Sequence, residues 1–183
     1  VVNIGELEGT VILRGFIIQN GDGQHGGGIN VANSNLLIED MIIRDNTGRT
    51  GGGVACTGEN TIIIRRTVVE NNRCNYVGGL GLRENKVTLE DVIFRENFGR
   101  HVGVSKVFGS LNMRNVAMLN NEGEYPGMEI AGIHSEEDMI WENLTVAGQI
   151  GRRPFNNPCL RGSFEEDSRL ILRNCLIYGN ENN

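Results

Sequence analysis

Residues 62–72 read Ile-Ile-Ile-Arg-Arg-Thr-Val-Val-Glu-Asn-Asn, and residues 87–97 repeat this pattern as Val-Thr-Leu-Glu-Asp-Val-Ile-Phe-Arg-Glu-Asn. The third residue of each stretch anchors a repeat with intervals of 24–31 residues. Seven copies of this anchor occur along the chain: Leu13, Ile38, Ile64, Leu89, Met113, Trp141 and Leu172. A period of this length is typical of a solenoid, in which each copy packs against the next.

Each copy combines strand-like alternation with turn residues. The positions two before, three after and five after the anchor are almost all apolar, and the three-residue step breaks the alternation and predicts a corner. An asparagine recurs eight residues after the anchor, at Asn46, Asn72, Asn97, Asn121 and Asn180. Because asparagine tolerates a left-handed backbone, we expect it to form a sharp bend. Glycine runs follow, and no stretch is typical of a helix.

These features predict how the copies stack. Each strand would pair in parallel with its equivalent in the next copy, while strands of other sheets supply the crossovers. The predicted fold is an all-β, single-stranded, right-handed parallel β-helix of about seven coils with three short parallel sheets. We assign residues 1–183 to one domain, with residues 1–9 as a partial coil and residues 10–183 as repeats. We expect a segment of a longer chain, because uncapped coil ends expose strand edges.

The residue after each anchor alternates in charge along the chain. This column reads Arg14, Glu39, Arg65, Glu90, Arg114, Glu142 and Arg173. In stacked coils each arginine would lie between two glutamates on the solvent side. Exposed pairs stabilise by only about 0.2–1 kcal/mol each, so we expect the ladder to set register more than stability.

Composition excludes several classes of function. The chain carries 26 glycines, 5% aromatic residues and a formal net charge of −6, and no apolar run approaches the roughly 20 residues that cross a bilayer. An acidic chain with two lysines is not typical of a nucleic-acid binder. The four cysteines lack zinc-type spacing, and we expect neither a disulfide nor a metal site. Cys56 and Cys175 fall on positions that should face the core.

The turn between the asparagine and the glycines is the most variable part of each copy. Stacking would bring eight candidate ligand-binding residues to this edge: Arg49, Arg73, Tyr76, Arg100, His101, Tyr125, Arg152 and Arg153. Arginine and tyrosine suit an acidic or a neutral glycan, through bidentate hydrogen bonds and ring contacts. The alternative is that these are simply solvated turn residues.

A second candidate surface is an apolar stripe four residues after each anchor, with Ile17, Ile42, Val68 and Ile93 as its main members. These residues should face away from the core, and contiguous exposed apolar residues usually mark an interface. We expect protein outside the coil to bury them, either a partner or another segment. Lateral or end-to-end self-association is also open.

Two sequence motifs carry a resemblance to a known family. Phe94-Arg95-Glu96-Asn97 matches an F-x-x-N motif, and Gly27-Gly28-Ile29 is similar to a G-G-A-[ILV] motif. The repeats resemble those of the pectin-lyase-like superfamily of right-handed β-helices, especially bacterial cell-surface repeats such as polymorphic outer-membrane passengers. The resemblance implies a noncatalytic extracellular or cell-surface scaffold, similar to an adhesin, that binds a polysaccharide or a surface protein along its turn edge.

The same superfamily implies an enzymatic alternative, a polysaccharide lyase or hydrolase acting on uronate-containing polymers. Its lyases use a basic residue to abstract a proton and often Ca²⁺, which makes Arg100, His101 and Arg152 the catalytic candidates. Asp22 lies four copies from Glu122, roughly 19 Å at the spacing of parallel strands, which is too far to share one ion. No other cofactor is implied. A structural assembly subunit is the second alternative.

Overall fold

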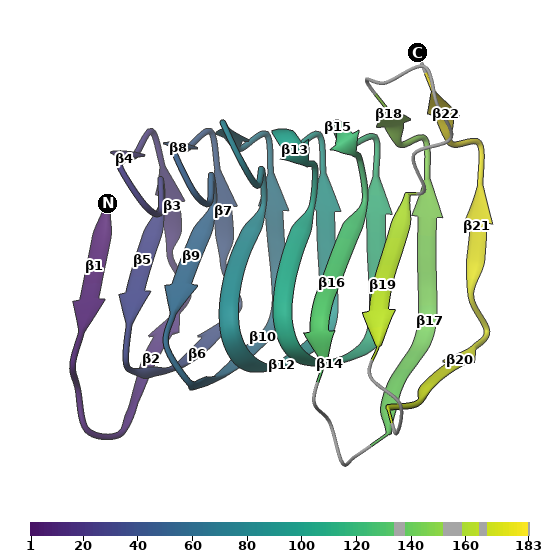
Figure 1. Ribbon diagram of the computed structural model, residues 1–183. Helices are drawn as coiled ribbons and strands as arrows, with labels where there is room; N and C mark the ends of the chain where they lie inside the picture. Colours follow the sequence, from purple (N-terminus) through teal and green to yellow (C-terminus); the bar gives the residue numbers. More distant parts are fainter. Residues whose placement is uncertain (134–137, 152–158, 165–167, 183) are drawn as a thin grey trace.

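The computed structural model describes residues 1–133, 138–151, 159–164 and 168–182, and these residues contain strands and turns but no helix. The chain winds as a right-handed parallel solenoid, with front strands running down and back strands running up in Figure 1. The predicted fold class, including its three parallel sheets, is confirmed. The number of turns is about six rather than seven, because seven copies of the anchor are separated by six steps.

The strands of the front sheet begin directly after the turns that contain the glycine runs. Its order is β1-β5-β9-β12-β14-β16-β19, with every pair parallel. Its separate strands are β1 (Val2–Gly5), β5 (Ile29–Ala32), β9 (Val54–Thr57), β16 (Met128–Ile133) and β19 (Leu160–Phe164). Two long strands, β12 (Leu80–Arg95) and β14 (Ser105–Leu119), continue from the front sheet into the back sheet and join the two.

The back sheet bends at the predicted corner. Its remaining strands are β2 (Thr10–Arg14), β3 (Ile17–Gln19), β6 (Asn35–Glu39), β7 (Ile42–Arg44), β10 (Asn60–Glu70), β17 (Met139–Ala147), β20 (Leu170–Arg173) and β21 (Leu176–Tyr178). Strand pairing aligns the seven anchors in one continuous column, from Leu13 beside Ile38 to Trp141 beside Leu172. The repeat read from the sequence is therefore the structural repeat.

A third, seven-stranded sheet closes the coil at the top of Figure 1. Its strands, in spatial order, are β4 (Asp22–Gly23), β8 (Thr47–Gly48), β11 (Arg73–Cys74), β13 (Phe98–Val102), β15 (Glu122–Tyr125), β18 (Ile150–Gly151) and β22 (Glu181–Asn182). Glycine is needed in this sheet because backbone approaches closely: a Cβ on Gly99 would lie 1.9 Å from the carbonyl oxygen of Val102.

The corner of the back sheet has a left-handed backbone residue in every copy. Two residues after the anchor, φ lies between 47° at Arg66 and 73° at Gly15. Asparagine or aspartate occupies five of these seven positions: Asp40, Asp91, Asn115, Asn143 and Asn174. These short polar side chains adopt this conformation more readily than most residues. The corner is thus built from local backbone preference.

The recurrent asparagine eight residues after the anchor has a different role from the predicted one. The left-handed residue lies one position earlier, as at Asn71, whereas Asn72 and Asn97 are fully buried. Each of these buried amides donates to the next asparagine and to a backbone carbonyl: Asn72 Nδ2 to Asn97 Oδ1 at 3.1 Å and to the Ile43 oxygen at 2.9 Å. The buried column is an asparagine ladder inside the coil, and it satisfies backbone groups that the turn leaves unpaired.

The core lies between the three sheets. Anchor residues such as Ile38, Ile64 and Leu89 are fully buried, as is Phe94 from the back sheet. Cys56 is also fully buried, between Val31 and Leu82 in strand register, as predicted. Burial of each such side chain contributes about 1.5–3 kcal/mol, so the stacked apolar columns supply most of the driving force for folding. In the terminal coils, Phe16 and Ile177 are exposed, because each has a neighbouring coil on only one side.

The predicted charge ladder is confirmed in part and corrected in part. Glu39 pairs with Arg65 at 2.6 Å and also with Arg14, and Arg114 pairs with Glu90 at 3.2 Å. Glu39 is not solvent-facing, however, because it is fully buried beneath the arginines. Burial opposes its ionisation, but hydrogen bonds from Arg65, Arg14 and Arg66 outweigh it and lower the pKa of Glu39.

Candidate functional site

The turn edge repeats a five-residue pattern whose side chains form columns along the solenoid. Equivalent backbone bonds join successive turns: the Val77 nitrogen donates to the Thr50 oxygen at 3.2 Å, and the Val102 nitrogen donates to the Tyr76 oxygen at 2.9 Å. One column therefore contains Thr50, Tyr76 and His101. Each turn leads directly into a strand of the front sheet.

Two aromatic rings of this column meet a third ring from the next turn. The rings of Tyr76 and His101 are stacked, with centroids 5.0 Å apart and planes within 9°. Tyr125, from the next turn, meets His101 edge-on at 5.2 Å and 84°. The stacking distance is close to the spacing of the coils, about 4.8 Å. The solenoid thus sets the spacing of the rings.

A row of charged residues lies beside the rings on the front sheet. Strand register places Gly81, Lys106, Glu129 and Arg161 side by side. Lys106 Nζ lies 2.8 Å from Glu129 Oε2, and Arg161 Nη1 lies 4.0 Å from Glu129 Oε1. Lys106 and Glu129 are each only 8% exposed, so they form a largely buried ion pair.

The rings and the charged row make direct contact. Lys106 Nζ lies 5.1 Å from the centre of the Tyr76 ring, and His101 Nε2 lies 3.3 Å from Glu129 Oε2. The guanidinium of Arg161 lies 4.9 Å from the centre of the Tyr125 ring and donates to its hydroxyl at 2.5 Å.

The other nitrogen of the imidazole, His101 Nδ1, lies 3.5 Å from Glu124 Oε2. One connected cluster thus contains seven residues, and we call it the ring–charge cluster: Tyr76, His101, Lys106, Glu124, Tyr125, Glu129 and Arg161.

The ring–charge cluster combines contacts that a ligand could use. Tyr76 is 38% exposed, and the Arg161 side chain is half exposed. Burial alone would lower the pKa of Lys106, but its hydrogen bonds to Glu129 and Tyr76 raise it above the ordinary value. Lys106 is therefore a cation at neutral pH. The site is a partly open aromatic surface fixed on a rigid, charge-paired base.

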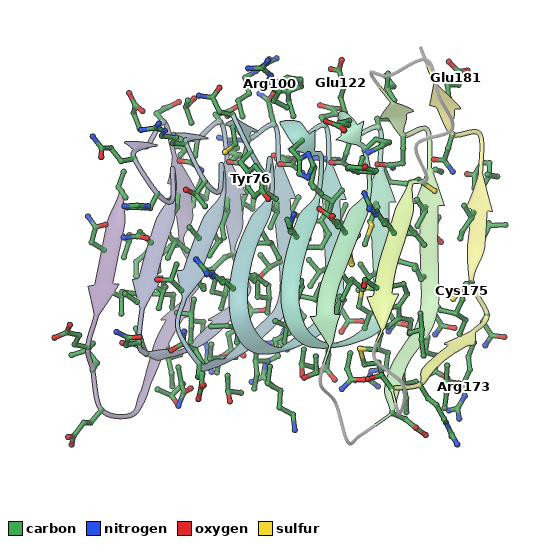
Figure 2. The ribbon with its side chains drawn as sticks, in the orientation of Figure 1. Tyr76, Arg100, Glu122, Arg173, Cys175 and Glu181 are labelled. Carbon is green, nitrogen blue, oxygen red and sulfur yellow. The ribbon has the colours of Figure 1, made fainter. Side chains whose placement is uncertain are left out.

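The structure brings together three of the eight residues predicted for ligand binding, Tyr76, His101 and Tyr125. Arg100 points outward from the top sheet in Figure 2, as does Glu122, whereas Tyr76 lies over the front strands. Arg73 lies over the ring of Phe98 at 5.8 Å, and Arg49 is exposed on its own turn. Arg152 and Arg153 lie outside the described residues. Arg49, Arg73 and Arg100, which we call the arginine edge, are therefore not part of the ring–charge cluster.

Sequence reasoning missed Lys106, Glu129 and Arg161. The signal was present in the repeat. The outward position that follows the first three glycine runs by two residues reads Asn30, Ala55 and Gly81. Strand register continues this position into Lys106, Glu129 and Arg161. A column comparison at that position would have found the change from small or neutral side chains to charged ones.

A hollow of about 470 Å³ lies at the opposite turn of the first coils and is lined by Leu7, Ser34 and Asn60 among others. Its polar groups already serve the turns. Ser34 Oγ accepts from the Leu7 nitrogen at 3.0 Å, and Asn60 Nδ2 donates to the Gly58 oxygen at 2.8 Å. The ring–charge cluster is the stronger candidate, because it contains charged groups that the turn itself does not require.

The cysteines and the acidic residues that were considered as metal ligands can also be placed in the structure. All four cysteines lie in the described part of the chain and are free. Cys175, predicted to face the core, is partly buried against it. Within the described ranges no group of three or more His, Cys, Asp or Glu side chains could hold a metal ion. Strand register places Asp22 four strands from Glu122, in agreement with the predicted separation.

The apolar stripe faces outward in the isolated chain. Ile17 is 56% exposed and Ile93 is 37% exposed, while Ile42 and Val68 are half-buried between neighbouring side chains. Whether a partner covers them stays a prediction. The described residues also contain no helix that is long and apolar enough to cross a membrane.

Comparisons of the chain with protein-family models, with curated proteins and with solved structures each find no match. The resemblance to pectin-lyase-like repeats therefore stands on the motifs of this sequence, and the parallel β-solenoid is what the structure adds to it.

Proposed function

We propose that this β-solenoid is a noncatalytic binding module whose ring–charge cluster holds a carbohydrate chain. The observation that carries the proposal is the arrangement of Tyr76, His101 and Tyr125 on three successive turns, supported from below by the Lys106–Glu129 ion pair. Sugars combine apolar C–H faces with hydroxyl groups. Partly exposed rings beside fixed charged groups offer contacts to both.

The rigidity of the site favours binding. The cluster sits on parallel strands and hydrogen-bonded turns, so its side chains are held in place before a ligand arrives, and less ordering is needed on association. We extend the proposal to an extracellular or cell-surface location, as the resemblance implies. A surface protein is the alternative partner.

A polysaccharide lyase is supported less well by the same geometry. Proton abstraction beside a uronate needs a neutral base, and the raised pKa of Lys106 keeps this lysine protonated. Among the catalytic candidates, Arg100 points away from the front face, and Arg152 lies outside the described residues. His101 is the one catalytic candidate that belongs to the cluster.

Calorimetric titration with a panel of neutral and uronate-containing polysaccharides tests the proposal. Wild-type protein should bind at least one polymer, and Tyr76→Ala should weaken that binding at least about tenfold, because a partly exposed tyrosine at the centre of a site often dominates affinity. Tyr178→Ala is the matched control, since Tyr178 is exposed on β21 in the last coil. No binding to any polymer, or equal loss in both variants, would contradict the proposal.

The same samples distinguish binding from turnover. Ultraviolet absorbance reports the double bond that a lyase leaves, and reducing ends report hydrolysis. A noncatalytic module should give neither signal. New absorbance that disappears in His101→Ala would instead support the lyase.

A further inference from the structure

We infer that the ring–charge cluster selects an uncharged, hydroxyl-rich sugar chain over a uronate polymer. This inference rests on the proposed function and deepens it by naming the class of ligand. It follows from how the charges of the cluster are arranged.

The charges of the cluster balance. Lys106 and Arg161 supply two positive charges, Glu124 and Glu129 supply two negative charges, and the chain as a whole carries −6 with histidine neutral. Strong attraction of a polyanion needs an excess of cations near its path. Neither the cluster nor the whole chain has that excess.

The most buried cation is already committed to a carboxylate. Lys106 and Glu129 are in contact at 2.8 Å, and each is 8% exposed. A uronate carboxylate that approached Lys106 would also approach Glu129 and be repelled by it. Pulling the pair apart would separate each largely buried group from its closest opposite charge, which is costly.

The groups that face a ligand favour hydroxyl donors. Glu124 lies beside the rings with 17% of its side chain exposed, and a carboxylate that accepts from a sugar hydroxyl forms a charge-assisted bond. Glu129 is largely buried and acts through its negative charge beneath the rings. Arg161 is oriented by its bond to the Tyr125 hydroxyl and its position over the Tyr125 ring. A neutral sugar can bond to these groups without introducing a like charge beside the glutamates.

The test compares uronate polymers with their carboxyl-reduced counterparts, which keep the same linkages but carry no charge. The reduced forms should bind at least about tenfold more tightly, because like charges disfavour the acidic forms. Their affinity should change little between about 50 and about 200 mM salt, since few ions are released on binding. Tighter, strongly salt-dependent binding of the uronate forms would overturn this inference alone, whereas binding by no polymer of either set would also overturn the proposed function.

A Glu129→Gln variant sharpens the result. It keeps the shape of the side chain but removes one negative charge and releases Lys106 from its ion pair. The preference for the reduced form should fall about tenfold, mainly through a gain for the uronate form. Glu96→Gln is the control, because Glu96 is exposed at the end of the back sheet, outside the cluster. Equal weakening of both polymers by Glu129→Gln would show a purely structural role and overturn the inference.

Discussion

The outward row at the start of the front sheet differs between the two halves of the solenoid. In the first half it contains Ala55 and Gly81, and in the second half it contains Lys106 and Glu129, at the same place in the repeat. The turn edge covers the row in both halves: Ala55 is 1% exposed and Lys106 is 8% exposed. Small residues satisfy the packing there, so the fold itself does not require a buried ion pair. The Lys106–Glu129 ion pair is therefore a feature that folding of the solenoid does not require.

The first prediction places a charge in the half of the row that lacks a partner for it. Ala55→Glu would bury a carboxylate beneath the turn, where Gly51 and Thr50 lie close to the neighbouring strand. We expect a loss of about 3–5 kcal/mol in the free energy of unfolding, measured by urea denaturation. Thr57→Glu, exposed on the same strand β9, should change stability by less than about 0.5 kcal/mol. Similar losses in both variants would contradict the claim that the turn edge covers the row at Ala55.

The second prediction breaks the ion pair itself. Glu129→Ala leaves Lys106 largely buried without its main partner and should cost about 3 kcal/mol in thermal or urea unfolding. The double variant Lys106→Met and Glu129→Met should return to within about 1 kcal/mol of wild type, because packed apolar side chains can replace a buried pair. The double variant should nevertheless lose carbohydrate binding. If it keeps full binding, the pair has no part in the site.

The third prediction compares the cluster with the charge ladder at the corner. Arg65, Arg14 and Arg66 lower the pKa of Glu39 from its ordinary value of 4.5, against the effect of burial. A lowered pKa stabilises the folded state above the ordinary value, and this stabilisation disappears as pH falls through the folded value. Wild-type protein should therefore lose more stability than Glu39→Gln between about pH 5 and about pH 3. Parallel pH profiles would show that the ladder adds nothing.

The smallest effect is expected on the apolar stripe. Ile93 is 37% exposed, whereas Ile64 in the same back sheet is fully buried. Ile93→Thr should change the unfolding free energy by less than about 0.5 kcal/mol, while Ile64→Ala should cost about 2–5 kcal/mol. Sedimentation of the Ile93 variant would also show whether the stripe joins chains: a wild-type oligomer that dissociates in the variant supports an interface, and unchanged sedimentation opposes one.

Much of the fold could be predicted because its determinants are local and repeated. The seven anchors, the buried columns and the corner before Met41 follow from apolar spacing, and strand register confirms them. The role of Asn72 could not be read in this way, because asparagine is equally suited to a left-handed turn and to a buried hydrogen-bond ladder. The choice between the two depends on which backbone groups the turn leaves unpaired.

The site was predicted only in part for a similar reason. Tyr76, His101 and Tyr125 each lie four residues after the recurrent asparagine, so their proximity follows from stacking of the copies, although a register shift places Tyr125 beside Val102. Lys106 and Glu129 belong to a different element, the front sheet, and the turn folds over them. That cover depends on close backbone packing at residues such as Gly99, which the repeat pattern does not reveal.

The most direct measurement is an amide-shift titration of isotope-labelled protein by NMR, with a neutral oligosaccharide taken from the polymer that binds best. The largest shifts should fall at Tyr76, His101, Lys106, Tyr125 and Glu129, with little change at Arg49, Arg73 and Arg100 on the arginine edge. Shifts confined to the arginine edge, or no saturable shifts at any residue, would contradict the assignment of the ring–charge cluster as the binding site.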